Sequence, residues 1–321
     1  MQLTVVLTVG GMLGGCSRGE PPSRARPSEA AGFPVVLTDA QGVSVRIEKP
    51  PERIVSTAPM ATEILFALGV GERVVAVTDQ CNYPPETRGL PRIGGWFNPS
   101  LEKTLAAEPD LVIASRGNPS DLLGALRKSG CPVFSVDPQT LEDIFTAIGD
   151  IGAATGEEEA AAALIAEMRG RLDEVARRLA DVPDQARPTA FMFLQVAPLW
   201  TAGSRTFQDD AMRAAGARNI AAAKVGFVPY SMEMLLAADP DFLLLSTMEG
   251  NPEWMKREVL AKSAFRRLSA ARNDRLVVLE ADPIMRPGPR IVEAIEAMAK
   301  AFYPERFPGP ASPSSAATSE R

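Results

Sequence analysis

Two stretches of the sequence are nearly alike: SLEKTLAAEPDLVIAS at Ser100–Ser115 and SMEMLLAADPDFLLLS at Ser231–Ser246. They align without a gap, and eight of the sixteen positions are identical. In each, a helical pattern ends at Pro-Asp, and a short apolar run typical of a buried strand follows. Because such units are common in α/β proteins, a chance match is the alternative. We interpret the match as an internal repeat, which predicts two related halves.

Short apolar runs alternate with helical segments around both copies of the repeat. In the first half the runs lie at 54–57, 74–78, 111–115 and 133–136. After residue 188 the same alternation resumes and closes with a helical pattern at 290–302. A short hairpin is expected at 35–47, before the first unit. This alternation is typical of βαβ units and predicts mostly parallel sheets with helices on both faces.

The segment Glu157–Ala180 differs from these units. It is rich in Ala, Glu, Arg and Leu, and Gly170 is its only Gly or Pro. These residues favour one helix of about 24 residues, or about 36 Å at 1.5 Å per residue. That length exceeds what packing one small domain requires. The sequence therefore predicts an α/β fold of two lobes bridged by a long helix.

The N-terminus has the features of a secretory signal. Leu3–Leu13 is an apolar run, too short to span a bilayer at about 20 residues, and is typical of a signal h-region. It ends in Leu-Gly-Gly-Cys, which resembles a bacterial lipoprotein signal and implies that Cys16 is acylated. A buried N-terminal strand is the alternative, but the proline-rich segment that follows offers it no partner.

These patterns predict an order of segments along the chain. We expect a signal peptide and lipobox at 1–16, a flexible tether at 17–32, an N-terminal α/β lobe at 33–155, the linking helix at 156–182, a C-terminal α/β lobe at 183–304 and a disordered tail at 305–321.

Composition excludes several classes of function. The chain has no histidine, which removes Ser-His-Asp and Cys-His nucleophile systems and the HExxH zinc site. Its net charge of -6 argues against nucleic acid as a partner. An enzyme that uses carboxylates alone, such as a glycosidase, stays open as the alternative from another class. Cys81 and Cys131 are too few for a metal cluster, and we expect them at opposite sheet ends and unpaired.

Segments next to the predicted strand ends are the candidates for function. In open α/β sheets ligands bind beyond the carboxyl ends of the strands, and two facing lobes offer a cleft between them. These segments lie at 79–85, 93–98, 116–118, 225–230 and 282–287. Aromatic residues occur in them in both halves and predict a large, flat organic solute. Taken singly, each could instead serve packing or surface charge.

Several motifs together resemble a known family. Pro51–Gly69, Asn82–Pro85, Asn98–Glu102 and Pro109–Ile113 are similar to the helical-backbone (class III) periplasmic binding proteins of ABC importers. That class serves cobalamin, ferric-siderophore and haem importers, and the resemblance covers about 34–303. It implies two Rossmann-like lobes on a rigid helix, with limited closure. It also implies a solute-binding protein rather than an enzyme, working with a permease dimer and its ATPase subunits.

The resemblance also assigns solute contacts. The motifs look most similar to the cobalamin-binding members, in which aromatic residues surround the corrin ring. The candidates by this resemblance are Tyr83, Trp96, Phe97, Arg116, Tyr230 and Arg286. A ferric siderophore is the alternative, because arginines can meet an anionic chelate. Haem ranks below both, since a chain without histidine has fewer ways to ligate it.

Glu102 and Glu233 occupy the same place in the two copies of the repeat. In similar proteins one such glutamate per lobe docks onto arginines of the permease, so the resemblance predicts that role here. A carboxylate near a helix N-terminus also has a sufficient structural reason. The protein is expected to be a lipid-anchored monomer in the periplasm or at the outer face of the cytoplasmic membrane. It would have no resident cofactor or metal, and cobalamin or another metal chelate would be its cargo.

Overall fold

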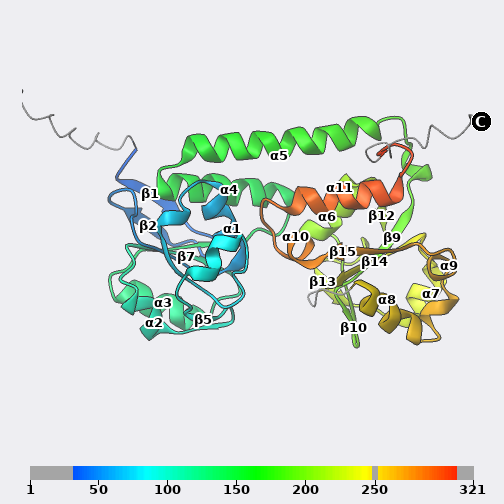
Figure 1. Ribbon diagram of the computed structural model, residues 1–321, viewed down its shortest axis with the longest axis horizontal. Helices are drawn as coiled ribbons and strands as arrows, with labels where there is room; N and C mark the ends of the chain where they lie inside the picture. Colours follow the sequence, from blue (N-terminus) through cyan, green and yellow to red (C-terminus); the bar gives the residue numbers. More distant parts are fainter. Residues whose placement is uncertain (1–31, 248–251, 309–321) are drawn as a thin grey trace, which may run out of the picture.

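The computed structural model describes residues 32–247 and 252–308. Within these ranges the chain forms two lobes side by side, with helix α5 (Glu158–Arg178) running above both (Figure 1). No helix within the described ranges is both long enough and apolar enough to cross a membrane. Cys16, residues 17–31 and most of the expected tail lie outside the described residues.

The N-terminal lobe is built on a parallel sheet in the order β4-β3-β7-β8. Its strands are β3 (Ile54–Ser56), β4 (Val74–Val77), β7 (Leu111–Ser115) and β8 (Val133–Val136). All residues of β3, β7 and β8 are buried, as expected where helices cover both faces of a sheet. The helices of this lobe are α1 (Pro59–Ala67), α2 (Leu101–Ala106), α3 (Ser120–Lys128) and α4 (Leu141–Thr155), with short 3-10 turns η1 (Gly71–Arg73) and η2 (Pro85–Gly89).

The C-terminal lobe repeats this topology. Its parallel sheet has the order β12-β9-β14-β15, formed by β9 (Thr189–Phe193), β12 (Arg218–Asn219), β14 (Phe242–Thr247) and β15 (Leu276–Glu280). When the four strands of each sheet are numbered by their order in the chain, the spatial order across both sheets is second, first, third, fourth. The helices are α6 (Phe207–Ala214), α7 (Met232–Ala238), α8 (Pro252–Ala261), α9 (Ser269–Arg272), α10 (Ala281–Met285) and α11 (Ile291–Phe302), with η3 (Asp184–Ala186) and η4 (Phe265–Arg267). The predicted pair of related α/β lobes is confirmed.

Smaller antiparallel sheets complete both lobes. The expected N-terminal hairpin is present, as β1 (Val35–Thr38) paired with β2 (Ser44–Ile47). Two very short strands, β5 (Gly94–Gly95) and β6 (Asn98–Pro99), make a turn that carries Trp96 and Phe97. In the C-terminal lobe β10 (Gln195–Val196), β11 (Leu199–Ala202) and β13 (Phe227–Pro229) form a further sheet. Strands β5, β6 and β10 have two residues each, too few for a period-2 pattern, so the sequence did not reveal them.

The two copies of the repeat occupy equivalent places. The first is α2 followed by β7, and the second is α7 followed by β14. Each helix begins the same way: the Ser100 side chain accepts a hydrogen bond from the Lys103 amide, and Ser231 accepts one from Met234. A serine N-cap satisfies one of the amides that a helix start leaves unpaired. The sequence repeat is thus a repeat of structure.

Helix α5 packs on α4 of the first lobe and α11 of the second (Figure 1). It spans 21 residues, a few fewer than expected, and Gly170 does not interrupt it. Gly156, with a φ of 78°, ends α4 and turns the chain into α5. Where the two helices meet, Gly152 lies so close to Ala161 that an added Cβ would be 2.5 Å from the Ala161 methyl carbon.

Replacing Gly152 by alanine is expected to lower the free energy of unfolding by about 1–3 kcal/mol, because the new methyl group must push α4 and α5 apart. Gly149→Ala, on the same helix, is the matched control because its Cβ would meet no atom within 4 Å. That control should gain stability through helix propensity. Urea unfolding followed by circular dichroism measures both. Equal stability of the two variants would contradict the close approach.

Two segments differ from the sequence-based expectation. Residues 282–287, expected as a loop, are partly helical, because Ala281–Met285 forms α10. Pro283 lies in the first turn of that helix, where a missing amide hydrogen costs nothing. At the other end, residues 305–308 were assigned to the disordered tail but contact α5. Arg306 pairs with Asp181, and the Arg178 guanidinium stacks on the ring of Phe307, 5.0 Å from its centroid.

The cysteines of the described residues are free thiols. Cys81 is buried, and its sulfur lies 3.1 Å from the hydroxyls of both Thr62 and Thr78. Burial, with a further contribution from Asp110, raises the pKa of the Cys131 thiol to about 11. Cys131 is therefore protonated and unreactive near neutral pH.

Candidate functional site

Asn118 ties together the loops at the carboxyl edge of the first sheet. Its Oδ1 accepts hydrogen bonds from the Thr57 hydroxyl (2.7 Å) and the Ser115 amide (2.9 Å). Its Nδ2 donates to the carbonyls of Thr57 (3.0 Å) and Trp96 (2.9 Å). The side chain is buried, so every one of its hydrogen-bonding positions is used by protein atoms. The ends of β3 and β7 and the Trp96 turn are therefore held as one unit.

Trp96 is fixed in this unit by its own contacts. Its Nε1 donates to the Ser115 hydroxyl at 3.1 Å, and its amide donates to Oε1 of Gln80 at 2.7 Å. Gly117 leaves room for the indole, because an added Cβ would lie 2.6 Å from the ring. Phe97 packs on Trp96 with ring centroids 4.6 Å apart and is 68% exposed. The turn thus presents a fixed aromatic surface at the edge where ligands bind in such sheets.

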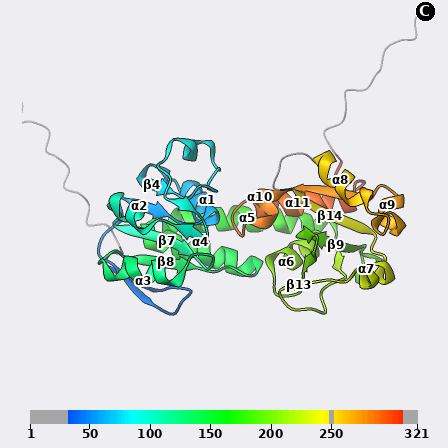
Figure 2. The ribbon, with the colours of Figure 1, turned by 90° about the horizontal axis from the view of Figure 1, so that it is seen from below.

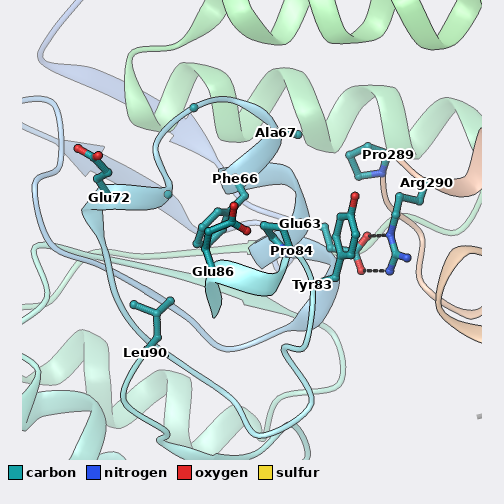
Figure 3. Close-up of a pocket in the computed structure, with 12 residues that line it drawn as sticks. Glu63, Phe66, Ala67, Glu72, Tyr83, Pro84, Glu86, Leu90, Pro289 and Arg290 are labelled. Atoms are coloured by element: carbon teal, nitrogen blue, oxygen red, sulfur yellow. Dashed lines mark hydrogen bonds and ion pairs between the residues drawn. The ribbon is translucent and has the colours of Figure 1, made fainter. Parts of the chain in front are cut away.

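Tyr83 belongs to the loop that follows β4 and lines a cavity of about 680 Å³. The cavity is lined by residues of both lobes, from α1 and the Tyr83 loop on one side to Pro289 and Arg290 on the other (Figure 3). The Tyr83 ring is 41% exposed, and the Arg290 guanidinium lies 3.9 Å from its centroid. An arginine in that position is attracted to the electron-rich face of the ring.

A charged cluster joins the lobes beside Tyr83. Glu63 on α1 accepts two hydrogen bonds from Arg290, at 2.7 and 2.9 Å, and one from Arg286 at 3.1 Å. Arg286 also donates to Oδ1 of Asn82 at 2.7 Å and pairs with Asp282 at 2.8 Å. Asn82 in turn donates to Asp282 at 3.0 Å. The Glu63 side chain is only 3% exposed, whereas that of Asp282 is 23% exposed. This network of two carboxylates and two guanidiniums is therefore buried at Glu63 and partly open to solvent at Asp282.

The electrostatics of the cluster favour the charged form of Arg290. Burial lowers the pKa of Arg290, but the hydrogen bonds and charge of Glu63, with Asp282 and Glu293, outweigh it and raise that pKa overall. Paired charges of this kind can be buried because each neutralises and hydrogen-bonds its partner.

The predicted solute contacts are only partly brought together. Gln80 links two of them. Its side chain accepts a hydrogen bond from the Trp96 amide, and its backbone carbonyl accepts one from Arg286 at 3.2 Å. The predicted contacts that the structure joins through hydrogen bonds, ring contacts and the charged cluster are Tyr83, Trp96, Phe97 and Arg286. Glu63, Gln80, Asn118 and Arg290 were not predicted as site residues, since only long-range contacts show their roles.

Tyr230 and Arg116 lie differently. Tyr230 is 9% exposed and packs in the core of the second lobe, with its ring centroid 5.1 Å from that of Phe191. Burial raises the pKa of its phenol. The Arg116 side chain is 70% exposed and pairs with Asp137 at 3.4 Å. Another aromatic side chain that the sequence did not single out, Phe227 on β13, is 46% exposed.

Glu102 and Glu233 lie in the first turns of α2 and α7. Both side chains are exposed, and neither has an ion-pair or hydrogen-bond partner within residues 32–247 and 252–308. Their helices lie on the side of the molecule away from α5 (Figure 1), and the view from below in Figure 2 shows one on each lobe, with α5 and α10 between the lobes. The two glutamates therefore belong to the first turns of helices that lie on the same side of the molecule, one in each lobe.

Comparison with known proteins agrees with this geometry. A family model described as "Periplasmic binding protein" matches residues 54–283. The chain is 30% identical over 304 residues to YvrC of Bacillus subtilis, an uncharacterized ABC transporter substrate-binding lipoprotein, covering 92% of this chain and 94% of that one. It is 30% identical over 308 residues to a cobalamin-binding protein of Halobacterium salinarum, covering 94% and 83%.

A solved structure gives the same result. The periplasmic heme-binding protein RhuT from Roseiflexus matches with a TM-score of 0.72 at 30% identity, covering 79% of this chain and 99% of that chain. The match extends over both lobes, and the resemblance predicted from the motifs is confirmed. Proteins of this family bind solutes for transport and are not enzymes, and those of ABC importers work with permease and ATPase subunits. The chain belongs to the periplasmic binding protein family and is a substrate-binding protein of an ABC transporter.

Proposed function

We propose that this protein captures a corrinoid between its lobes and delivers it to a membrane permease. The observation that carries the proposal is the aromatic pair Trp96 and Phe97 at the carboxyl edge of the first sheet, with the exposed Tyr83 on the loop after β4. Flat aromatic side chains suit the face of a large ring ligand, which buries much apolar surface on binding. The name of the Halobacterium salinarum relative supports the same solute class.

The charges near these aromatic side chains favour a corrinoid over an anionic chelate. Arg286 and Arg290 are the cations beside Tyr83, and Glu63 and Asp282 already neutralise them. A ferric siderophore or haem with free carboxylates needs unpaired positive charge, which this cluster does not offer. Arg116, largely exposed, is the remaining cation among the proposed contacts. Tyr230, packed in the core, supports the wall of the second lobe.

The proposal includes attachment to the membrane. Cys16 would carry the lipid, and residues 17–32 would tether the lobes near the permease, in the periplasm or at the outer face of the cytoplasmic membrane. The relative from Bacillus subtilis is named a lipoprotein, which supports this part. Mass spectrometry of the protein from its native membrane tests it: a diacylglyceryl adduct on Cys16 is expected and should disappear in Cys16→Ser.

Titration with cyanocobalamin, followed by heat or by tryptophan fluorescence, tests the solute. We expect one-to-one binding, which Trp96→Ala weakens at least about tenfold because the indole loses its stacking area. Gly117→Ala, which displaces the same ring without removing it, should weaken binding in the same direction. Phe307→Ala is the matched control, since that ring lies on Arg178 far along α5.

Either of two results would refute the corrinoid assignment. One is the lack of cyanocobalamin binding at high micromolar concentration while a ferric hydroxamate or haemin binds. The other is an affinity for cyanocobalamin that Trp96→Ala and Phe307→Ala leave equally unchanged.

A further inference from the structure

The loop that carries Tyr83 is held by both lobes. Within its own lobe, the Asp79 amide donates to the Gly94 carbonyl at 2.9 Å, and the buried Cys81 accepts a hydrogen bond from Arg92 at its carbonyl, at 2.8 Å. The Gln80 carbonyl and the Asn82 side chain both accept hydrogen bonds from Arg286. The Tyr83 ring lies against Arg290. All three loop residues are exposed, and the contacts of the Asn82 and Tyr83 side chains are with the second lobe. The positions of these two side chains therefore depend on where the second lobe places its arginines.

Those arginines are in turn held by an acid of the first lobe. The Glu63 carboxylate accepts hydrogen bonds from Nε and Nη2 of Arg290, which together form a bidentate pair. It accepts a third hydrogen bond from Nη1 of Arg286. A bidentate pair fixes the plane of a guanidinium as well as its position. Figure 3 shows the result: the Tyr83 ring lies beside the Glu63–Arg290 pair, at the end of the cavity nearest the second lobe. The arginine plane is thus set where it stacks on the ring.

A separate contact joins the lobes elsewhere. Asp210 on α6 accepts a hydrogen bond from the Leu141 amide at the start of α4, at 3.0 Å. Together with the packing of α5 on α4 and α11, it holds the lobes independently of Glu63. Loosening the Glu63 cluster should therefore disturb the Tyr83 loop while the two lobes stay folded and connected.

We propose that Glu63, Arg286 and Arg290 form an inter-lobe clamp that positions Tyr83 for solute binding. The three are positioning residues, because they act on the solute through the Tyr83 side chain. The inference rests on the proposed function in taking Tyr83 as a solute contact. It adds that affinity depends on a charge cluster that itself need not touch the solute.

Fluorine NMR offers a test that needs no ligand. The chain has only three tyrosines, Tyr83, Tyr230 and Tyr303, so 3-fluorotyrosine incorporated in the purified protein gives three signals. Tyr83→Phe identifies the signal of interest, and the two buried tyrosines serve as internal references. In Arg290→Lys, which keeps the charge but loses the planar fork, the Tyr83 signal should shift while the other two stay in place. Glu63→Gln should shift the same signal.

The same variants then enter the cyanocobalamin titration, where each is expected to weaken binding about tenfold. Glu296→Gln is the matched control: it breaks a bidentate pair with Arg171, at 2.7 and 2.9 Å, between α5 and α11. It should change neither the Tyr83 signal nor the affinity. If Glu63→Gln does not fold, Arg290→Lys still gives both measurements, because it leaves Glu63 a cationic partner.

The outcomes separate the clamp from the solute assignment. An unchanged Tyr83 signal in Arg290→Lys would overturn the clamp, and so would a shifted signal with unchanged affinity. If the unsubstituted protein fails to bind cyanocobalamin, the proposed function falls instead. The fluorine signals would then still decide whether the cluster positions Tyr83.

Discussion

Replacing Glu63 by alanine is expected to lower the free energy of unfolding by about 3–5 kcal/mol. The substitution leaves Arg286 and Arg290, which are 13% and 11% exposed, with Asp282 as the one remaining carboxylate within ion-pair distance in the part of the chain that the structure describes. Two guanidiniums then share one acid in a site that water enters poorly. The large effect comes from this uncompensated buried charge, rather than from the small net value of a well-formed pair.

Denaturant unfolding at neutral pH, followed by both circular dichroism and tryptophan fluorescence, measures this loss and shows whether the lobes unfold together. Glu48→Ala is the control because it removes the same kind of side chain from an exposed pair with Arg46, where solvent screens the charges. The control should leave the unfolding midpoint in place. A Glu63→Ala midpoint equal to that of the control would show that the cluster contributes nothing to stability.

Reversing both docking charges, in Glu102→Arg with Glu233→Arg, is expected to lower solute uptake at least about tenfold while the affinity for the solute in solution stays unchanged. On the proposed docking role, each glutamate meets a cationic side chain of the permease, and a like charge there costs several kcal/mol. Both glutamates are exposed, and substitutions at such surface positions usually change the free energy of unfolding by less than about 0.5 kcal/mol. Each single reversal should cause a smaller loss, because one lobe can still dock.

Uptake of labelled cyanocobalamin by vesicles that contain the permease and ATPase subunits measures this effect. Glu159→Arg with Glu167→Arg is the matched control, since these exposed glutamates lie on α5, on the opposite side of the molecule from α2 and α7. The control should transport normally. Normal uptake by the doubly reversed docking variant would remove both residues from the interface, and a fall in solution affinity would place them at the solute instead.

Much of the fold follows from local sequence signals. The repeat predicted the two related units α2–β7 and α7–β14, because helix caps, the Pro-Asp stop and a buried apolar run act within a few residues of one another. The long helix was predictable for the same reason, since propensity adds up along a segment without breaks. Its ends differ from the expected Glu157 and Ala180 by one and two residues, as caps and fraying commonly allow.

The site was harder to predict because it depends on contacts distant in the sequence. Residues 79–85, 93–98 and 116–118 were expected near one another, since parallel strands end at the same edge of a sheet. That rule places loops, but it does not say which side chains are free. Tyr230 is an aromatic residue in a candidate segment and was therefore predicted to contact the solute. The structure instead buries it against Phe191. Asn118, a short polar residue in a loop, instead organises three segments.

The sequence by itself therefore determined the two α/β lobes, the helix that bridges them and the edge of the sheet where we propose that the solute binds. Only the tertiary structure decided that Glu63 faces Arg286 and Arg290, which lie 223 and 227 positions away in the sequence. Local patterns report the backbone conformation of neighbouring residues, and they carry no information on which of many acids meets which of many arginines. That pairing arises when the second lobe comes to rest against the first.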